Sequence, residues 1–169
     1  MSDDRLSGAL VLDALHRAGV THVISVPDLG TSKGLLWPLV TDARFKLVRI
    51  CREEEGVGLC AGLIAAGQRP VMLIQYTGLL ASMNALRAIA LEYREPICTL
   101  VGVLFDDAPD DPRHSANLGV SRILPTLDGA GLRHHVVSHD AHVADMERLL
   151  ERAFSQSEPI NFILARHPH

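Results

Sequence analysis

Short, nearly uncharged apolar runs alternate along this chain with longer segments whose apolar residues recur every three or four positions. Six runs of the first kind are expected to be strands, at 23–26, 46–51, 71–75, 97–103, 135–137 and 160–165. The run at 23–26 is apolar almost throughout and ends at Pro27, which is typical of a strand buried on both faces. Such a strand needs helices above and below its sheet, so this alternation limits the possible folds more than any other feature.

The intervening segments carry the helical spacing of apolar residues. Helices are expected at 6–18, 33–40, 54–66, 79–93, 118–127 and 141–154. Short connections between these elements imply right-handed crossovers. The sequence therefore predicts an α/β fold: a doubly wound, mostly parallel six-stranded sheet with helices on both faces. The length of 169 residues suits one domain over residues 1–169.

Charge and composition narrow the classes of partner. The chain has 16 Lys and Arg against 20 Asp and Glu and a net charge of −4, which argues against a nucleic-acid or anionic-membrane surface. Its first residues lack the basic and apolar regions of a signal peptide, and the longest uncharged stretch, 70–86, contains several polar residues. The three cysteines are expected to be small core residues in a reducing compartment. A cytoplasmic protein is therefore the expectation.

One segment, 52–62, carries three consecutive carboxylates, Glu53, Glu54 and Glu55, where a strand passes into a helix. Carboxylates in a first helical turn complement the helix dipole, so an ordinary structural interpretation stays open. Adjacent helical residues point about 100° apart, so at most one of the three can face a given pocket.

Three segments in chain order share one resemblance. They are Ser-Val-Pro-Asp at 25–28, Arg-Glu-Glu-Glu-Gly at 52–56 followed by a helix of small residues, and Gln-Tyr-Thr-Gly-Leu at 75–79 with Asn84 downstream. Together they resemble the pyrimidine-binding domain of thiamine-diphosphate enzymes. Within that group the sequence is most similar to the alpha-subunit family of sulfopyruvate decarboxylases and the matching half of phosphonopyruvate decarboxylases.

The resemblance implies thiamine diphosphate as the cofactor and Glu54 as the glutamate that hydrogen-bonds its aminopyrimidine ring. The activated cofactor attacks the 2-oxo carbon of a 2-oxo acid and takes up the electron pair released as CO₂ leaves. Glu53 and Glu55 would then be solvated or structural. The remaining cofactor-binding positions implied by the resemblance are Pro27, Thr77, Gly78, Leu79 and Asn84.

Proton handling and substrate binding are implied for a second group of residues. The resemblance suggests Asp28 and His114 as catalytic groups that also contact the substrate, with Gln75 beside them. His114 ends an acidic loop after a central strand, where ligands of open α/β sheets gather, although a solvated acidic turn is the alternative. Lys33 could bind a sulfonate or phosphonate, or it could be an ordinary exposed lysine. Arg52 and Arg113 are alternatives for the same role.

The sequence departs from the family after Gly78. Leu80 and Ala81 stand where the family usually has Gly-Asn, and Tyr76 replaces a smaller polar residue. These departures leave a second hypothesis open, a non-catalytic binding or assembly domain. A histidine-rich stretch at 134–142 has no completing ligand set, so we expect no metal there.

The sequence contains no Gly-Asp-Gly, the signal for binding the diphosphate through Mg²⁺. The resemblance therefore implies that the cofactor's diphosphate and Mg²⁺ are held by a partner beta subunit in a hetero-oligomer such as α2β2. We expect the helices at 56–66 and 79–90 to meet that partner. Sulfopyruvate, converted to sulfoacetaldehyde and CO₂, is the first substrate candidate. Phosphonopyruvate, other 2-oxo acids and a carboligation product stay open.

Overall fold

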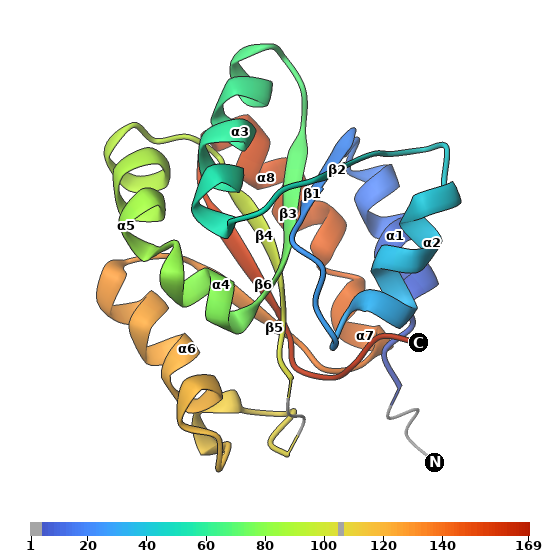
Figure 1. Ribbon diagram of the computed structural model, residues 1–169, viewed down its shortest axis with the longest axis vertical. Coiled ribbons are helices and arrows are strands. Elements are labelled where there is room, and N and C mark those ends of the chain that lie inside the picture. The colour runs from blue at the N-terminus through green and yellow to red at the C-terminus, as the bar shows by residue number, and fades with distance from the viewer. Residues whose placement is uncertain (1–4, 105–106) are drawn as a thin grey trace.

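A computed structural model describes residues 5–104 and 107–169 (Figure 1). Its strands form one sheet in which every neighbouring pair is parallel. The order across the sheet is β2-β1-β3-β4-β6-β5, and the chain crosses it in the manner of a doubly wound fold. The predicted fold class is thereby confirmed. The strands are β1 (His22–Ser25), β2 (Lys46–Arg49), β3 (Pro70–Gln75), β4 (Cys98–Gly102), β5 (His134–Val137) and β6 (Ile160–Leu164).

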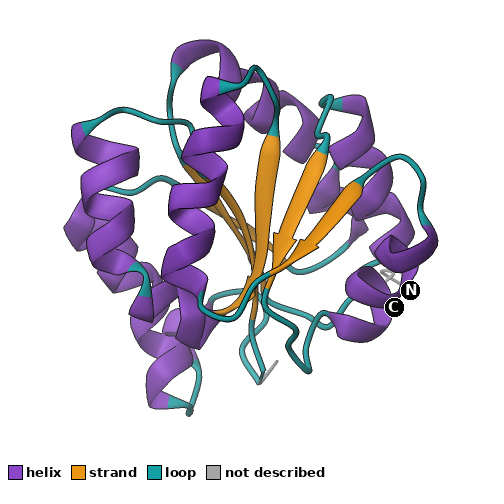
Figure 2. Ribbon diagram, turned by 45° about the horizontal axis from the view of Figure 1, so that its top comes forward, coloured by secondary structure: helices purple, strands orange, loops and turns teal. Residues whose placement is uncertain are grey.

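Helices cover both faces of the sheet (Figure 2). One face packs against α1 (Gly8–Arg17), the π-helical η1 (Ser32–Leu36), α2 (Trp37–Thr41), α7 (Asp140–Val143) and α8 (Met146–Gln156). The other face packs against α3 (Glu53–Ala65), α4 (Tyr76–Ala81), α5 (Met83–Leu86), the π-helical η2 (Arg87–Glu92) and α6 (Leu118–Ala130), which follows the 3₁₀ turn η3 (Pro112–His114). None of the helices in the described ranges is both long enough and apolar enough to cross a bilayer.

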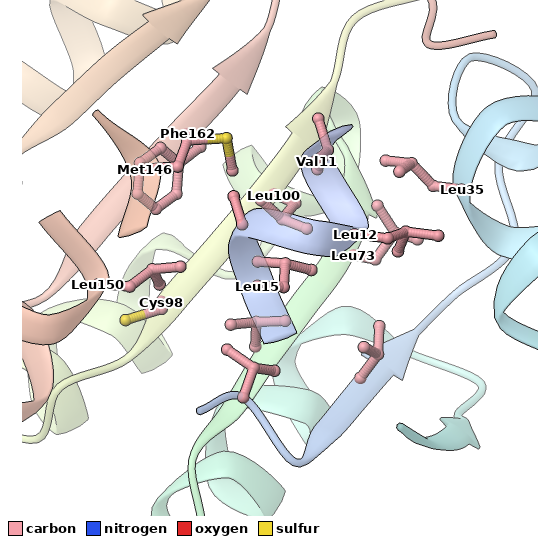
Figure 3. Close-up of a cluster of buried hydrophobic side chains, with 14 of the residues drawn as sticks. Val11, Leu12, Leu15, Leu35, Leu73, Cys98, Leu100, Met146, Leu150 and Phe162 are labelled. Atoms are coloured by element: carbon pink, nitrogen blue, oxygen red, sulfur yellow. The ribbon is translucent and has the colours of Figure 1, made fainter. Parts of the chain in front are cut away.

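The two cores follow from the alternation of side chains along each strand. Leu73, Leu100 and Phe162 point toward α1 and α8, where they meet Leu15 and other fully buried residues (Figure 3). The next residue along each strand belongs to the opposite core, beneath α3 to α6. Burial of one such side chain contributes about 1.5–3 kcal/mol, so both layers of helices are firmly attached to the sheet.

The first helix is held at its start by backbone contacts. A Cβ atom added to Gly8 would lie 1.9 Å from the carbonyl oxygen of Gly34 in η1, and one added to Gly34 would lie 2.2 Å from the carbonyl oxygen of Pro168. The N–H of Gly8 also donates to the carbonyl of His169 over 3.0 Å. The end of the chain, η1 and α1 are thus stacked with no room for a side chain between them.

The prediction of one helix over 79–93 is wrong. Helical structure already begins at Tyr76 and is interrupted at Ser82, after which two further pieces, α5 and η2, complete the segment. The hydroxyl of Ser82 donates to the carbonyl of Gly78 over 2.8 Å, and such back-bonding bends helices.

The prediction of one helix over 141–154 is also wrong. The segment divides into α7 and α8 because α7 is anchored to the segment before α1. The N–H of Ser7 donates to Asp140 Oδ1 over 2.7 Å, and the N–H of Asp140 donates to the carbonyl of Arg5. These contacts set the direction of α7 independently of α8, and the sequence pattern does not reveal them.

The cysteines differ from one another. Cys60 and Cys98 are buried as predicted, and burial raises the pKa of the Cys60 thiol to about 12 and raises that of Cys98 further still. Cys51 is exposed in the turn between β2 and α3, so the prediction of a core position is wrong for this residue. The turn carries it past the end of the edge strand, where no helix covers it.

Candidate functional site

The carboxyl ends of β1 and β3 mark the point where the strand order reverses. These neighbouring strands send their connections to opposite faces, β1 into η1 and β3 into α4. In open α/β sheets such a point provides the crevice where ligands bind. The segments at 25–28, 52–56 and 75–79 each follow a strand and lie along this edge, so the topology gathers the three motifs that the sequence keeps apart.

The three glutamates take three different environments. Glu53 is half-buried and lies against Gly78, where an added Cβ would be 2.3 Å from Glu53 Oε1. Glu54 Oε1 pairs with the guanidinium of Arg52 at 2.6 Å, and 35% of the Glu54 side chain is exposed. Glu55 points to solvent. The 100° steps of the helix separate the carboxylates, and the favourable dipole of α3 acts on all of them.

The second motif is only partly exposed. Gln75 is half-buried at the end of β3, and Thr77 is exposed in the first turn of α4. Leu79 has no exposed surface and belongs to the core beneath α3 to α6. Its side chain is thus buried within this chain, and the cofactor contact of Leu79 stays a prediction. The predicted apolar stripe that includes Leu79 and Leu86 is confirmed as core.

Tyr76, one of the departures from the family pattern, has a structural role. The residue is 8% exposed, and its ring lies against Gly119 at the start of α6, where an added Cβ would be 2.6 Å from Tyr76 Cε2. The tyrosine therefore joins α4 to α6. Asn84, predicted to bind the cofactor, is exposed on α5, and its side-chain oxygen accepts from the Nε of Arg87 over 3.2 Å.

The first loop is organised by Asp28. Its two carboxylate oxygens accept from the backbone N–H of Thr31 over 2.7 Å and from the Thr31 hydroxyl over 2.6 Å, and its carbonyl accepts from Ser32. Pro27 and Leu29 are exposed on either side. This arrangement uses both Asp28 oxygens to shape the loop before η1.

The same loop reaches across to β4. A Cβ added to Gly102 would lie 2.5 Å from Thr31 Cγ2 and 3.6 Å from Asp28 Oδ1, so Gly102 allows the loop to sit on the end of a strand two places from β1. Lys33 follows in η1 with its side chain exposed. Asp28 is therefore at the carboxyl edge as predicted, and Lys33 lies on the solvent side of that edge.

His114 lies in η3, on the connection between β4 and α6. Its side chain is 80% exposed in η3, and its Nδ1 is 3.6 Å from Asp111 Oδ2. Nearby, the hydroxyl of Ser115 and then the N–H of Ala116 donate to Asp107, and these bonds lower the pKa of that carboxyl. Residues 105–106 of the predicted loop lie outside the described ranges.

His167 was missed by the sequence reasoning. Its ring Nε2 is 3.1 Å from the carbonyl oxygen of Val103 and 3.0 Å from that of Leu104, at the end of β4. The Cβ position of Gly30 is 3.5 Å from both the His167 ring and Asp28 Oδ1. The available signal was its position just after the last strand, because a parallel strand delivers the following residue to the same edge.

The other histidines form structural contacts. His134 pairs with Asp128 at 2.8 Å, and His135 faces His142 with ring centroids 6.1 Å apart. Within the described residues, no three His, Cys, Asp or Glu side chains are grouped to hold a metal ion. Two hollows in the surface, one beside Asp128 and one beside Leu10, involve none of the predicted site residues.

Comparison with known proteins finds relatives of the kind that the motifs suggest. No protein-family model matches the chain. Sulfopyruvate decarboxylase of Methanosarcina acetivorans is 32% identical over 153 residues, which cover 88% of this chain and 37% of that protein. Sulfopyruvate decarboxylase subunit alpha of Methanococcus maripaludis is 34% identical over 91 residues, or 54% of each chain. By sequence, this chain is similar to sulfopyruvate decarboxylases and their alpha subunits.

The likeness confirms the resemblance inferred from the three motifs. A similar match, 33% over 95 residues, joins the chain to the sulfopyruvate decarboxylase alpha subunit of Methanothermobacter thermautotrophicus. The chain spans about one third of the length of the first of these sulfopyruvate decarboxylase relatives and just over half of the alpha subunits. The longest match leaves about 20 residues of this chain outside it, so the segment 25–84 with all three motifs falls inside.

Proposed function

We propose that this chain is the alpha-type subunit of a thiamine-diphosphate-dependent decarboxylase that converts sulfopyruvate to sulfoacetaldehyde and CO₂. The observation that carries the proposal is the placement of Glu54 at the carboxyl edge of the sheet, in a segment matched to sulfopyruvate decarboxylases. The structure of the site supports a cofactor-binding role for α3, and the names of the relatives supply the choice of substrate.

The residues around Glu54 suit the pyrimidine end of the cofactor. Arg52 occupies one carboxylate oxygen and steadies the side chain, which remains partly exposed. Gly58, one turn further along α3, is exposed, and a Cβ added there would have no atom within 4 Å. A flat ring can therefore approach the helix backbone beside Glu54, and its ring nitrogen can accept a hydrogen bond from the protonated carboxyl group. The surroundings of Glu54 thus fit an aromatic ring.

Each residue of this chain then has a limited task. Thiamine diphosphate, when bound, supplies the electron-deficient ring carbon that stabilises the charge left as CO₂ departs. Glu54 would hold the pyrimidine ring and control the proton on its ring nitrogen. Arg52 would keep Glu54 oriented, and Asp28 would keep the first loop closed over β4 through Thr31.

The substrate anion would meet positive charge at the same edge. A sulfonate needs a cation or N–H donors nearby, and the exposed Lys33 at the start of η1 is the candidate in this chain. His114, which is mostly exposed in the single chain, would contribute a proton only after a partner covers η3. We therefore rank Glu54 first, Asp28 second, and His114 and Lys33 after them.

A partner subunit is part of the proposal. Three of the relatives are themselves named as alpha subunits, and the sequence has no Gly-Asp-Gly. The outer side of α3 is unusually apolar for a surface, since Leu59 is 37% exposed and Leu63 and Ile64 are only half-buried. We propose that a beta subunit covers this side and holds the diphosphate and Mg²⁺.

The test uses this chain together with a candidate beta subunit from the same organism, recognised by its Gly-Asp-Gly motif. With thiamine diphosphate and Mg²⁺, the pair is expected to release CO₂ from sulfopyruvate, and the chain alone is expected to release none. Glu54→Gln should lower kcat at least about 100-fold because it removes the proton-handling carboxyl group. Glu55→Gln, an exposed neighbour in the same turn, is the matched control and should retain activity.

The outcomes separate the alternatives. Undiminished activity of the Glu54→Gln complex would refute the assigned mechanism. Activity with phosphonopyruvate or pyruvate in place of sulfopyruvate would move the substrate assignment within the same reaction class. A stable complex that releases no CO₂ from any 2-oxo acid would favour the assembly-domain hypothesis raised by Leu80 and Ala81.

A further inference from the structure

The contact between Glu53 and Gly78 joins two segments that the proposed site depends on. An added Cβ on Gly78 would lie 2.3 Å from Glu53 Oε1 and 2.4 Å from both Cδ and Cγ of the same side chain. The carboxylate and its stem therefore occupy the volume that a side chain at position 78 would need. Glu53 begins α3 and Gly78 lies in the first turn of α4, so the contact connects the starts of these two helices.

The backbone conformation of Gly78 does not require a glycine. It is not one of the glycines with a positive φ, which are Gly19, Gly67 and Gly131. Its φ is one that alanine adopts, and the three atoms nearest to an added methyl group all belong to Glu53. Glu53 in turn forms no ion pair within the described part of the chain, whereas Glu54 pairs with Arg52. The close approach to Gly78 is therefore the contact of Glu53 that a substitution can test.

We propose that Glu53 is a positioning residue, seated on Gly78, that sets the rotation of the first turn of α3 and thereby the direction of Glu54. Because successive helical residues are about 100° apart, anchoring one side chain fixes where the next one points. The inference rests on the proposed function for the role of Glu54. The packing on which it depends belongs to this chain and can be tested without a catalytic assay.

The first experiment is a mutant cycle read by thermal unfolding of the full chain. Gly78→Ala displaces Glu53 and Glu53→Ala removes it, so each should lower the unfolding midpoint by about 2–6 °C. The unfolding midpoint of the double variant should be no lower than that of the less stable single variant, because both changes abolish the same contact. Gly129→Ala in α6, where an added Cβ meets nothing within 4 Å, is the control and should not lower the midpoint.

The second experiment uses the reconstituted complex and separates positioning from catalysis. Glu53→Ala should raise the KM for thiamine diphosphate about tenfold, because small displacements of a site are costly. Glu53→Gln keeps the shape of the side chain and should restore the KM of the wild type. Glu54→Gln should instead lower kcat.

Each result decides the inference. Additive losses in the unfolding cycle would overturn it, and so would a Glu53→Gln variant that binds cofactor as poorly as Glu53→Ala. If the complex has no activity with any 2-oxo acid, the proposed function fails. The unfolding cycle would still show whether Glu53 and Gly78 are coupled.

Discussion

Helices α1 and α3 lie on opposite faces of one sheet and differ in how they meet their surroundings. In α1, the apolar side faces the core, where Leu15 is fully buried. The first residue of this helix, Gly8, lies against the backbone of Gly34. In α3, apolar residues are distributed all around the helix, Leu59 is partly exposed, and an alanine at Gly62 would touch no other atom within 4 Å.

The difference in burial indicates a different role for each helix. A helix that is apolar on every side is typical of a buried one. In α1 the large apolar residues other than Leu10 are buried within this chain, so α1 is mainly a structural element. In α3 Leu59 is 37% exposed, and Leu63 and Ile64 are only partly buried against the core, which fits a surface that a partner subunit would cover.

Leucine truncation should separate the two helices most strongly. Leu15→Ala removes a side chain with no exposed surface and should lower the free energy of unfolding by about 2–5 kcal/mol. Leu59→Ala in α3 should change it by no more than about 0.5 kcal/mol in the isolated chain. Urea unfolding followed by circular dichroism measures both. Equal losses would show that α3 is as fully packed in the single chain as α1.

Glycine substitution should give effects of opposite sign. Gly8→Ala places a methyl group against the carbonyl of Gly34 and should lower the free energy of unfolding by about 1–3 kcal/mol. Gly62→Ala in α3 meets no atom and should raise it by about 0.5–1 kcal/mol through helix propensity. The same urea titrations apply, with the wild-type chain as reference. A stabilised Gly8→Ala variant would contradict the backbone stacking at the start of α1.

Lowering the pH should reduce the free energy of unfolding by a smaller amount, through His142 in α7 on the same face of the sheet as α1. Burial first, and then the neighbouring His139 and His135, lower the pKa of His142 in α7, and its Nδ1 accepts from the N–H of Ser138 over 3.3 Å. The folded-state pKa is therefore below the value of 6.5 for the unfolded chain. The contribution of His142 to stability is complete above that value and is lost as the pH falls below it.

The measurement is the unfolding free energy of the wild type and of His142→Gln at pH 7.5 and at pH 5.5. Stability should fall more between these pH values in the wild type, because glutamine binds no proton. Asp110 and Asp145 act on His142 in the opposite direction and limit the size of the effect. Helix α3 contains no histidine, so identical pH dependence of the two proteins would place the acid-sensitive group elsewhere.

Much of the fold could be predicted because its signals are local. The apolar runs that became β1, β3 and β6 are short, nearly uncharged and flanked by helical spacing, and each falls within one or two residues of its predicted bounds. The breaks in the predicted helices could not be predicted. They depend on Ser82 bonding to Gly78 and on Asp140 bonding to Ser7, and the second of these pairs is 133 residues apart.

The candidate site also contains residues that local motifs predict and residues that they do not. Local motifs identified Asp28, Glu54 and the segment at 75–79, and the topology of the sheet places them on one edge. His167 escaped notice because no motif surrounds it, and it reaches the edge only because β6 runs parallel to β4. His114 was predicted from its loop, and the structure leaves its side chain 80% exposed in η3.

The pattern of residues was enough to predict the alternation of strands and helices and the α/β class, and it shows three carboxylates at the start of one helix. These follow from side-chain polarity and periodicity, which act over a few residues. The tertiary structure was needed to place Glu53, which packs against Gly78. Glu54 instead pairs with Arg52, two residues before it, and Glu55 is exposed. The space around Glu53 is limited by α4, a helix that the chain reaches more than twenty residues later, so a pattern within the first turn of α3 cannot reveal it.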